Sequence, residues 1–376
     1  MMRGTPFGAR SYSDRFVCYP GAGGWLARAL VAVVCAACML MMSVSAGCGL
    51  TRTGSPAIAE APASKAVPLA SAESIPSGNP LFVFAAVGDP HIAVNGTFDH
   101  KYIKAGDKGP QLLATFVRDI NAHRPRVGFV VLLGDVTDKG NGSEFALAQK
   151  ILDSLACPLY PLVGNHDNFE SDNKQGWKRF AHRDSTDYTF DVKGFHFIAI
   201  DCTNNPYTPG AVGCDSTLRL WVAKDLVRNP DKPTFVLSHY NMWERFWNSQ
   251  FDTTRHYAEY RGMKDLREVL ERAGNVVAVI NGHVHANRVE QHNGIYYIDV
   301  GATLVGHPSI RYFYVFPDRV EVTYAYVSDA TLLDYVAQVG TECLYCFDSK
   351  AVVDYADGKV SDKQFTIPLL TAPMSK

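Results

Sequence analysis

Residues 127–140 read VGFVVLLGDVTDKG, an apolar run followed by a glycine-bounded heptapeptide that carries two acids, Asp135 and Asp138. The apolar run predicts a buried β-strand. Open α/β sheets bind their ligands beyond the carboxyl ends of the strands, which is where both acids would stand. Aspartate and glycine are also common turn residues, so the heptapeptide alone fits a plain turn as well as a site. The ends of the other strands distinguish these two interpretations.

Predicted strands and helices alternate along most of the chain, with one hairpin at Lys193 and Gly194. One helix begins with Ser143 and Glu144 in capping positions. Parallel units interrupted by hairpins indicate an α/β fold in which two mixed sheets pack together with helices outside. The predicted strands span residues 81–87, 127–133, 159–163, 187–192, 195–201, 234–238, 276–280, 294–300, 311–316 and 320–327, and the predicted helices 111–123, 143–156, 216–227 and 263–273.

Five predicted core strands are each followed by polar side chains that can bind a metal. A single loop histidine is more often an ordinary surface group. Five of the twelve histidines, however, stand just past predicted strands. A common sheet edge would bring all of these side chains together. In chain order they are Asp89 and His91, then Asp135, then Asn165, His166 and Asp167, then His239, and finally His283 and His285.

The chemistry of this set favours two metal ions. Carboxylates, imidazoles and one amide oxygen suit manganese, iron or zinc better than copper or calcium. Seven candidate ligands exceed the need of one ion, but they serve two if one carboxylate bridges: Asp89, His91, Asp135, Asn165, His239, His283 and His285. Two ions about 3.5–4 Å apart clamp the attacking and leaving oxygens in phosphoryl transfer.

The ordered blocks D-x-H, G-D-x-x-D-x-G, G-N-H-D, a single histidine and G-H-x-H resemble those of the calcineurin-like metallophosphoesterases over about residues 81–327. The resemblance implies a four-layer αββα sandwich with two mixed β-sheets and a dinuclear metal site at the carboxyl ends of the strands. It also implies a hydrolase of small phosphate esters, either monoesters or diesters, with a metal-bridging hydroxide as the nucleophile. The opening heptapeptide is then both a turn and part of the site.

Carried over residue by residue, the resemblance gives each side chain a role. Asp89, His91, Asp135 and His285 would hold the first metal, and Asp135, Asn165, His239 and His283 the second, with Asp135 as the bridge. His166 would contact the phosphate and protonate the leaving oxygen as the general acid, with Asp167 orienting it. Asp138 would hold the loop from outside the ligand set.

Two differences from other members indicate which branch of the family the chain resembles. The fourth block reads Ser238-His239-Tyr240 instead of the double histidine of many relatives. The purple acid phosphatases have a metal-binding tyrosine after the second block and lack the D-x-H histidine, whereas this chain has His91 and no such tyrosine. It therefore resembles the bacterial cyclic-nucleotide phosphodiesterase-like and general phosphoesterase branch.

Other functions fit the sequence less well. A catalytically silent binding module on the same scaffold would be favoured by missing ligands, and none is missing. A redox role for the C-x-x-C of Cys343 and Cys346 leaves the metal set unexplained. Disulfides in an oxidising compartment would also fit this pair, and they would fit Cys202 with Cys214. The net charge of −2 argues against a nucleic-acid groove, which needs a basic face.

The segment after His239 bears on the substrate. One interpretation is a lip over the metals whose aromatic side chains stack on a base and whose arginines meet a second phosphate. The other is a long loop packed on itself by its aromatic residues. The side chains concerned are Trp243, Arg245, Trp247, Arg255, His256 and Tyr257.

The amino terminus predicts export. Four arginines precede the uncharged stretch 29–50, as in a secretory leader over residues 1–48. The sequence SAGC resembles a lipobox, with Cys48 as the lipidation candidate, although Ser45 replaces a larger aliphatic residue. Cleavage near Ala46 or a retained membrane anchor also fits. Each alternative places the protein in the bacterial cell envelope or periplasm, with membrane contact only through this leader or a lipid anchor.

The composition divides the remainder of the chain into three parts. Residues 49–80 are rich in Ala, Ser and Pro, which predicts a disordered tether. The metallophosphoesterase domain is expected over residues 81–328, followed by a carboxyl-terminal extension over 329–376.

Overall fold

The computed structural model describes the chain from residue 75 onward with several gaps. The described residues are 75–99, 104–169, 174–203, 213–243, 245–246, 256–257, 262–340 and 349–369. The predicted leader, Cys48, nearly all of the tether, and Cys343 and Cys346 lie outside them. Within the described part, no helix combines the length and the apolar character needed to cross a membrane.

Six described strands form a first mixed sheet in the order β16-β15-β14-β1-β4-β5. β1, β4 and β5 run parallel, and β14, β15 and β16 extend the sheet in antiparallel fashion from β1. The parallel half therefore brings the ends of three predicted strands to one edge. The bounds are β1 Phe82–Val87, β4 Phe129–Leu132, β5 Leu159–Pro161, β14 Ser309–Val315, β15 Arg319–Tyr326 and β16 Phe365–Pro368.

Six further described strands form a second mixed sheet in the order β12-β13-β11-β8-β7-β6. Its four central strands are parallel, and β6 and β12 pair as antiparallel edges. The bounds are β6 Tyr188–Val192, β7 Phe195–Ile200, β8 Thr234–Ser238, β11 Val276–Asn281, β12 Arg288–His292 and β13 Ile295–Asp299. The hairpin predicted at Lys193 and Gly194 is confirmed as β6–β7.

Aromatic side chains join the two sheets. The ring of Phe84 on β1 stacks on Phe129 and Phe313 at centroid distances of 5.1 and 4.4 Å within the first sheet. The same ring meets Phe197 and Phe235 of the second sheet edge-on at 5.6 and 5.5 Å. Stacked and edge-on contacts of this kind are favourable ring geometries, so the sandwich interface is a packed core.

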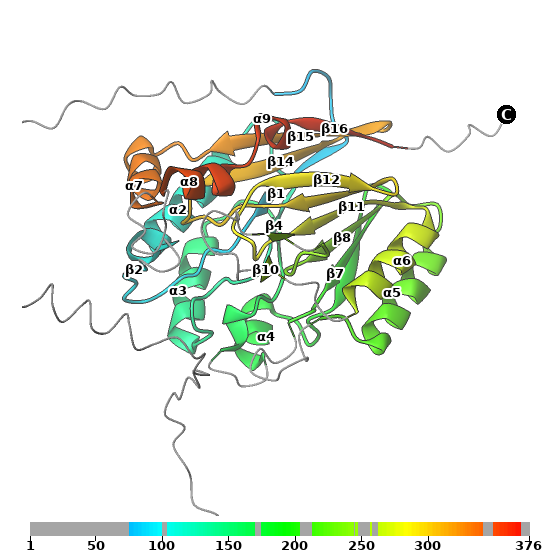
Figure 1. Cartoon of the computed structure of the whole chain (residues 1–376), viewed down its shortest axis with the longest axis horizontal. Coiled ribbons are helices and arrows are strands. Elements are labelled where there is room, and N and C mark those ends of the chain that lie inside the picture. Colours follow the sequence, from blue (N-terminus) through cyan, green and yellow to red (C-terminus); the bar gives the residue numbers. More distant parts are fainter. Residues whose placement is uncertain are drawn as a thin grey trace, which may run out of the picture. The chain divides into compact units, whose positions relative to one another are not determined.

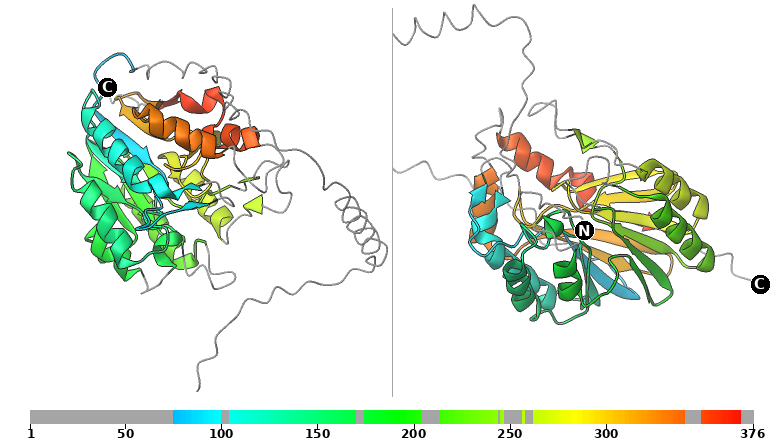
Figure 2. Two further views of the ribbon diagram at one scale, coloured as in Figure 1. Left: turned by 90° about the vertical axis from the view of Figure 1, so that its left-hand side faces the viewer. Right: turned by 90° about the horizontal axis from the view of Figure 1, so that it is seen from below.

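Helices cover both outer faces, which confirms the predicted α/β sandwich with two mixed sheets (Figures 1 and 2). Apolar residues of α2 and α3 pack on the first sheet, and α5 and α6 cover the second. The helices of the sandwich faces are α2 Gly109–Ala122, α3 Gly142–Leu152, α4 Gln175–Ala181, α5 Ser216–Arg228 and α6 Met263–Ala273.

Helix α3 differs from its prediction at both ends. Its N-cap is Asn141, whose side chain accepts a hydrogen bond from Glu144 N at 3.0 Å, so Ser143 is already inside the helix. The carboxylate of Glu144 accepts from Lys139 N at 2.9 Å. The helix ends at Leu152 instead of residue 156. The predicted cap was wrong because Asn141 is an equally good capping residue two positions earlier.

The described part of the predicted carboxyl-terminal extension is built into the fold. Strand β16 pairs with β15, and the buried Arg311 of β14 donates to Asp362 O at 2.7 Å. Apolar residues of α7 and α8 pack with Ala105 and with the segment from Ala302 to Val305. The helices of this part are α7 Ala330–Gly340, α8 Ser349–Asp357 and α9 Val360–Lys363.

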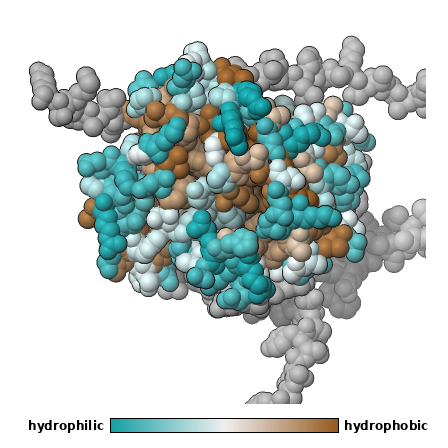
Figure 3. Space-filling model, turned by 180° about the vertical axis from the view of Figure 1, so that it is seen from behind, coloured by the Kyte–Doolittle hydropathy of each residue, from teal (hydrophilic) through white to brown (hydrophobic). Residues whose placement is uncertain are grey.

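Some apolar side chains remain on the surface. The face opposite to the view of Figure 1 carries patches of hydrophobic residues between hydrophilic ones (Figure 3). Single exposures are usual on protein surfaces and identify no particular interface. Among the residues that the structure describes, the large hydrophobic ones that are at least half exposed are Ile75, Val94, Leu220, Val227 and Val360.

Candidate metal centre

The structure brings all seven predicted ligands to one edge of the sandwich. Each follows a strand: β1, β4 and β5 in the first sheet, and β8 and β11 in the second. The side chains are buried or nearly so. They are Asp89 and His91 after β1, Asp135 after β4, Asn165 after β5, His239 after β8, and His283 and His285 after β11.

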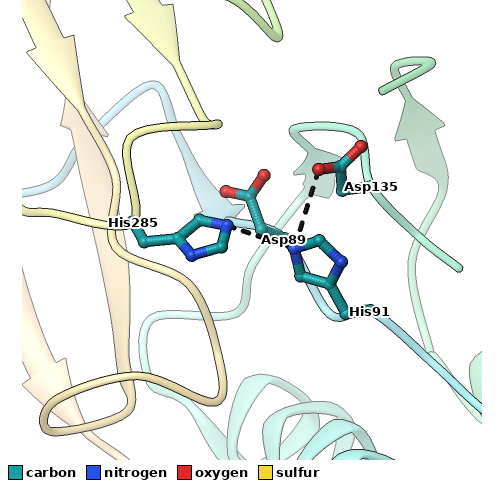
Figure 4. A group of neighbouring side chains, drawn as sticks. All are labelled: Asp89, His91, Asp135 and His285. Carbon is teal, nitrogen blue, oxygen red and sulfur yellow. Dashed lines mark hydrogen bonds and ion pairs between the residues drawn. The ribbon is translucent and has the colours of Figure 1, made fainter. Parts of the chain in front are cut away.

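These ligands fall into two groups that share Asp135. Candidate ligand atoms of Asp89, His91, Asp135 and His285 lie within 4.8 Å of one another (Figure 4). The same limit holds for Asp135, His239 and His283. Asn165 joins the second group, because its Oδ1 lies 3.1 Å from His239 Nε2.

Asp135 has the geometry of a bridging carboxylate. Its Oδ2 lies 3.6 Å from His91 Nε2, and its Oδ1 lies 3.4 Å from His239 Nε2. The amide of His166 donates to the same Oδ1 at 2.8 Å and fixes the carboxylate. Each oxygen therefore faces a different ligand group.

The backbone is strained at the ligands. Among the described residues, nine non-glycine residues have a positive φ, and five of those nine are candidate ligands. Left-handed conformations cost such residues about 1–3 kcal/mol each and cluster at functional sites. The five are Asp89 (φ 44°), His91 (43°), Asp135 (45°), His283 (68°) and His285 (52°).

Two motif glycines allow the close approach of the loops. A Cβ atom on Gly164 would lie 2.0 Å from Asp135 N and 2.1 Å from its Oδ1. A Cβ atom on Gly282 would lie 2.8 Å from Asp89 Oδ2. The amide of the next residue, His283, donates to both oxygens of Asp89 at 3.0 and 3.1 Å. Larger residues at either glycine would push the carboxylates out of the site.

Burial sets the charge of the imidazoles. It holds the pKa values of His91 and His283 well below their usual range and lowers that of His285 to about 3. These three rings are therefore neutral and able to bind metal. His239 Nδ1 lies 2.7 Å from Leu133 O, which leaves Nε2 facing Asn165 and Asp135. A carbonyl partner of this kind orients a metal-binding histidine.

The pKa values of the two carboxylates and of His239 depend on one another. Burial raises the pKa of Asp89 to about 8, and the neighbouring Asp135 contributes to the rise. Burial also opposes ionisation of Asp135, but His239 and His166 outweigh it and hold its pKa well below the usual range. In turn, burial disfavours charged His239, yet Asp135 raises the pKa of this ring to about 9. At neutral pH the metal-free site therefore keeps protons where cations would bind.

The donor set fits two metal ions. His91 Nε2 and His285 Nε2 converge to 3.1 Å, with Asp89 and Asp135 beside them. Nitrogen and carboxylate donors that point at one place are the ligands of zinc, iron and manganese. The two groups would hold one ion each, with Asp135 between them.

Asp167 is arranged differently from the prediction, because it is not the hydrogen-bond partner of the His166 ring. His166 Nδ1 lies 2.7 Å from the main-chain oxygen of Asp138. The carboxylate of Asp167 instead accepts from the amides of Thr137 and Gly164, both at 2.9 Å. The predicted orienting role of Asp167 is thus corrected, because its oxygens tie together two site loops, and the main-chain oxygen of Asp138 is the hydrogen-bond partner of the His166 ring.

Comparison with known proteins identifies the family. The family model of the calcineurin-like phosphoesterases matches residues 82–287, more than half of the chain. The chain belongs to this family. It is accordingly a metal-dependent phosphoester hydrolase.

Individual relatives are similar to this calcineurin-like phosphoesterase at low identity. A "Probable glycerophosphodiester phosphodiesterase GpdQ" of Arcobacter nitrofigilis is 23% identical over 203 residues, covering 54% of this chain and 71% of the relative. "Serine/threonine-protein phosphatase CPPED1" of Danio rerio is 28% identical over 233 residues, covering 57% and 73%. A solved dimetal phosphatase from Danio rerio shares the fold with a TM-score of 0.54 at 14% identity, covering 65% of this chain and 96% of that one.

The substitution of Tyr240 for a second histidine has a packing consequence in this calcineurin-like phosphoesterase. The Tyr240 ring is buried and meets the His283 ring edge-on at a centroid distance of 4.5 Å. It also lies 5.3 Å from the ring of His239. Tyr240 therefore supports two ligands of the second group from the side.

The predicted lip is described only in part. Trp243 is engaged within the protein, because its ring stacks on His292 at 4.1 Å and the Arg267 guanidinium lies 3.9 Å from it. Trp243 therefore packs against α6 and β12 and not against the rest of its own segment, so its contacts match neither interpretation in full. Two short strands, β9 Arg245–Phe246 and β10 His256–Tyr257, pair in antiparallel fashion. Trp247 and Arg255 lie outside the described residues.

Cys202 and Cys214, the pair left open by the sequence, lie in contact with each other. Cys202 and Cys214 are buried and carry free thiols. A hydrogen bond with Cys214, together with burial, raises the pKa of Cys202 well above its usual range. Neither thiol lies in the two ligand groups.

Lys104 is a site neighbour that sequence reasoning missed. This buried residue belongs to the short strand β3 Lys104–Ala105, which pairs with β2 Phe98–Asp99. Its Nζ lies 3.3 Å from Asp138 Oδ1 and 3.5 Å from His91 Nδ1. The surrounding sequence carries no motif, so only the three-dimensional contact reveals it.

Proposed function

We propose that this protein is an exported two-metal hydrolase of small phosphate esters, with His166 as the general acid. The observation that carries the proposal is the pair of ligand groups sharing Asp135. Two bound ions would activate a water molecule for attack and neutralise charge on the phosphoryl group. Asp89, His91, Asp135 and His285 would hold one ion, and Asp135, Asn165, His239 and His283 the other.

His166 has the placement expected of an acid. Its ring is 23% exposed by side chain, whereas the ligand rings of His91 and His239 are at most 1% exposed. Its Nδ1 faces Asp138 O, which leaves Nε2 to carry the proton for the leaving oxygen. Proton delivery matters most when the leaving group is a poor one, such as an alkoxide.

Metal removal tests the proposed function. Protein treated with a chelator should lose hydrolysis of p-nitrophenyl phosphate and bis-p-nitrophenyl phosphate and should recover it with manganese, zinc or iron. The ratio of the two rates separates a monoesterase from a diesterase. The variant Asp135→Asn should not recover, while Asp318→Asn, which alters an exposed ion pair with Arg319, should behave as the parent. Full activity after verified removal of metal would exclude the two-metal mechanism.

We also propose that the protein is exported and processed near Cys48, on the strength of the basic and then apolar amino terminus. Mass spectrometry of the mature amino terminus should find either a lipid on Cys48 or cleavage near Ala46. Cys48→Ser separates the two, because it abolishes lipidation and leaves ordinary cleavage in place. An intact leader on a cytosolic protein would refute export.

A further inference from the structure

We infer that Lys104 is a positioning residue of the hydrolase. In this inference its ammonium group anchors Asp138, and Asp138 in turn sets the imidazole of His166 against the first ligand group. The inference rests on the proposed role of His166. It assigns a function to a buried charge that the two-metal reaction does not itself use.

Burial makes the contact between Lys104 and Asp138 significant. Lys104 is only 7% exposed, yet it carries an ammonium group. Such a charge is costly to bury unless it is paired and hydrogen-bonded. Its Nζ donates a hydrogen bond to Asp138 Oδ1 at 3.3 Å. An apolar side chain would fill the same space without this cost, so the charge itself has a role at this position.

Asp138 lies next to His166, His91 and Lys104. Its main-chain oxygen lies 2.7 Å from His166 Nδ1, and its amide donates to Ile92 O at 3.1 Å. Its Oδ1 also lies 3.6 Å from His91 Nδ1 and 3.9 Å from His166 Nδ1. Movement of Asp138 would therefore displace the partner of the general acid.

Metal binding would strengthen the need for Asp138. A histidine that binds metal through Nε2 keeps its proton on Nδ1 and needs an acceptor for it. Lys104 has only donors, so it cannot accept the His91 proton. The carboxylate of Asp138 can accept this proton. It then lies between two donors, Lys104 Nζ and His91 Nδ1. Lys104 keeps this carboxylate in place between His91 and His166.

The carboxyl-terminal part of the chain holds Lys104 in position. Ala105 N donates to Leu304 O at 3.0 Å, and the Ala105 side chain packs in a cluster with Val336 of α7. Tyr335 of α7 donates through its hydroxyl group to Asp107 Oδ2 at 2.9 Å. Helix α7 lies beyond residue 287, where the family match ends. This support is therefore a feature of this chain outside the matched region.

Lys104→Met, which keeps the length and removes the charge, tests the inference. It should slow hydrolysis of an alkyl phosphate ester by about 10–100-fold, the usual effect of losing an outer partner at a metal site. Hydrolysis of the p-nitrophenyl ester should fall much less, because its leaving group needs little protonation. The matched control is Lys232→Met, which removes a lysine paired with Asp191 at 2.6 Å near the opposite end of β8 from His239.

A double-mutant cycle shows whether Lys104 acts through His166. In a His166→Ala background, Lys104→Met should have little further effect, because the group it positions is already gone. Full additivity of the two substitutions would overturn the inference, and so would equal slowing of alkyl and aryl esters. Unchanged kinetics in Lys104→Met would overturn it as well.

A second measurement does not require activity. In ¹H–¹⁵N spectra of metal-free protein, the His166 Nδ1 proton should be visible in the parent and in Lys232→Met, and exchange-broadened in Lys104→Met. An unchanged resonance in Lys104→Met would contradict the inference.

A second variant serves if Lys104→Met does not fold. Tyr335→Phe removes only the hydroxyl group that contacts Asp107, and it should show the same leaving-group dependence more weakly. If Tyr335→Phe shows no leaving-group dependence, the inference is wrong. Failure of the parent on every ester would refute the proposed function, while the spectra would still test the role of Lys104.

Discussion

At the residue scale, the site combines strain with excess charge. Five candidate ligands have left-handed backbones, and Asp89 and Asp135 lie buried close together. Bound cations would offset the cost of burying the two carboxylates by taking the place of the protons on Asp89 and His239. The metal-free site is therefore already shaped for its ions.

Substitution at the site should separate metal ligand from acid. His166→Ala removes no ligand, so it should keep both metals and slow alkyl phosphate hydrolysis by about 10²–10⁴-fold, as expected for lost acid catalysis. It should remain nearly normal on p-nitrophenyl esters, whose leaving group is already acidic. Asp135→Ala should lose metal and fail on both substrates. Metal analysis with both rates checks this assignment, and loss of a metal ion from His166→Ala would show that His166 is a ligand.

Metal binding should release protons near neutral pH. In the metal-free protein Asp89 has a pKa of about 8 and His239 one of about 9, so both are protonated at pH 7. A metal needs the carboxylate and the neutral ring, so binding should release about two protons, and affinity should rise as pH increases toward 9. Calorimetry in two buffers of different ionisation enthalpy measures this number. Asp89→Asn should release about one proton fewer, and binding without proton release in the parent would contradict these charge states.

Prediction from sequence was most successful for the place where the candidate ligands gather. Asp89, Asp135 and His239 follow long apolar runs, and parallel strands bring their carboxyl ends to one edge. The contact of His166 with Asp138 was not predicted, because it depends on how two loops cross. Lys104 was missed for a similar reason: its position follows from packing against α7, more than 200 residues further along the chain.

At the element scale, buried strands were predictable, whereas two edge strands, β12 and β16, were not. β1 and β8 are buried throughout; β1 appears in the sequence as an unbroken apolar run, and β8 as three apolar residues between Thr234 and Ser238. β12 has no fully buried residue, and β16 has one, so neither shows a clear pattern of hydrophobicity. Both are edge strands whose pairing is set by the neighbouring strand.

Asn287 joins the loop of His283 and His285 to helix α8, and replacing it should weaken both stability and metal binding. Its amide donates to Ala356 O at 2.9 Å, and its Oδ1 accepts from Gly301 N and from the buried Arg311, both at 3.2 Å. Asn287→Ala should cost about 1–3 kcal/mol, because two buried donors lose an acceptor. It should also weaken metal binding more than it lowers the rate at saturating metal, because the loop is loosened.

Urea unfolding and metal titration of Asn287→Ala check this expectation. Asn121→Ala is the matched control, because Asn121 makes similar hydrogen bonds to Ser154 O and Ala156 N but lies on the surface away from the ligands. Its metal affinity should equal that of the parent. Equal metal affinity in Asn287→Ala would show that α8 does not support the histidine loop.

At the scale of the whole molecule, one unit spans residues 70–376. The family match ends at residue 287, yet β14 and β15 lie beside β1 in the first sheet and β16 completes its edge. The first sheet is therefore completed by strands that lie beyond the matched region. Sequence composition alone did not reveal this, because the segment after residue 328 carries no family motif.

Deleting residues 329–376 tests this integration. The deletion would uncover Leu112, Leu304 and Val305, which pack against α7 and α8, and would leave β15 as an unpaired edge. Exposing three large apolar side chains costs about 5–9 kcal/mol at roughly 1.5–3 kcal/mol each. That is comparable with the whole stability of a typical domain, about 5–15 kcal/mol. The shortened protein should therefore aggregate or melt at least about 10 °C lower.

The control is a deletion of residues 370–376 alone, which keeps β16 and should leave the melting temperature unchanged. Circular dichroism melting with size-exclusion chromatography measures both, and a shortened protein as stable as the parent would show that residues 329–376 are a separable appendage.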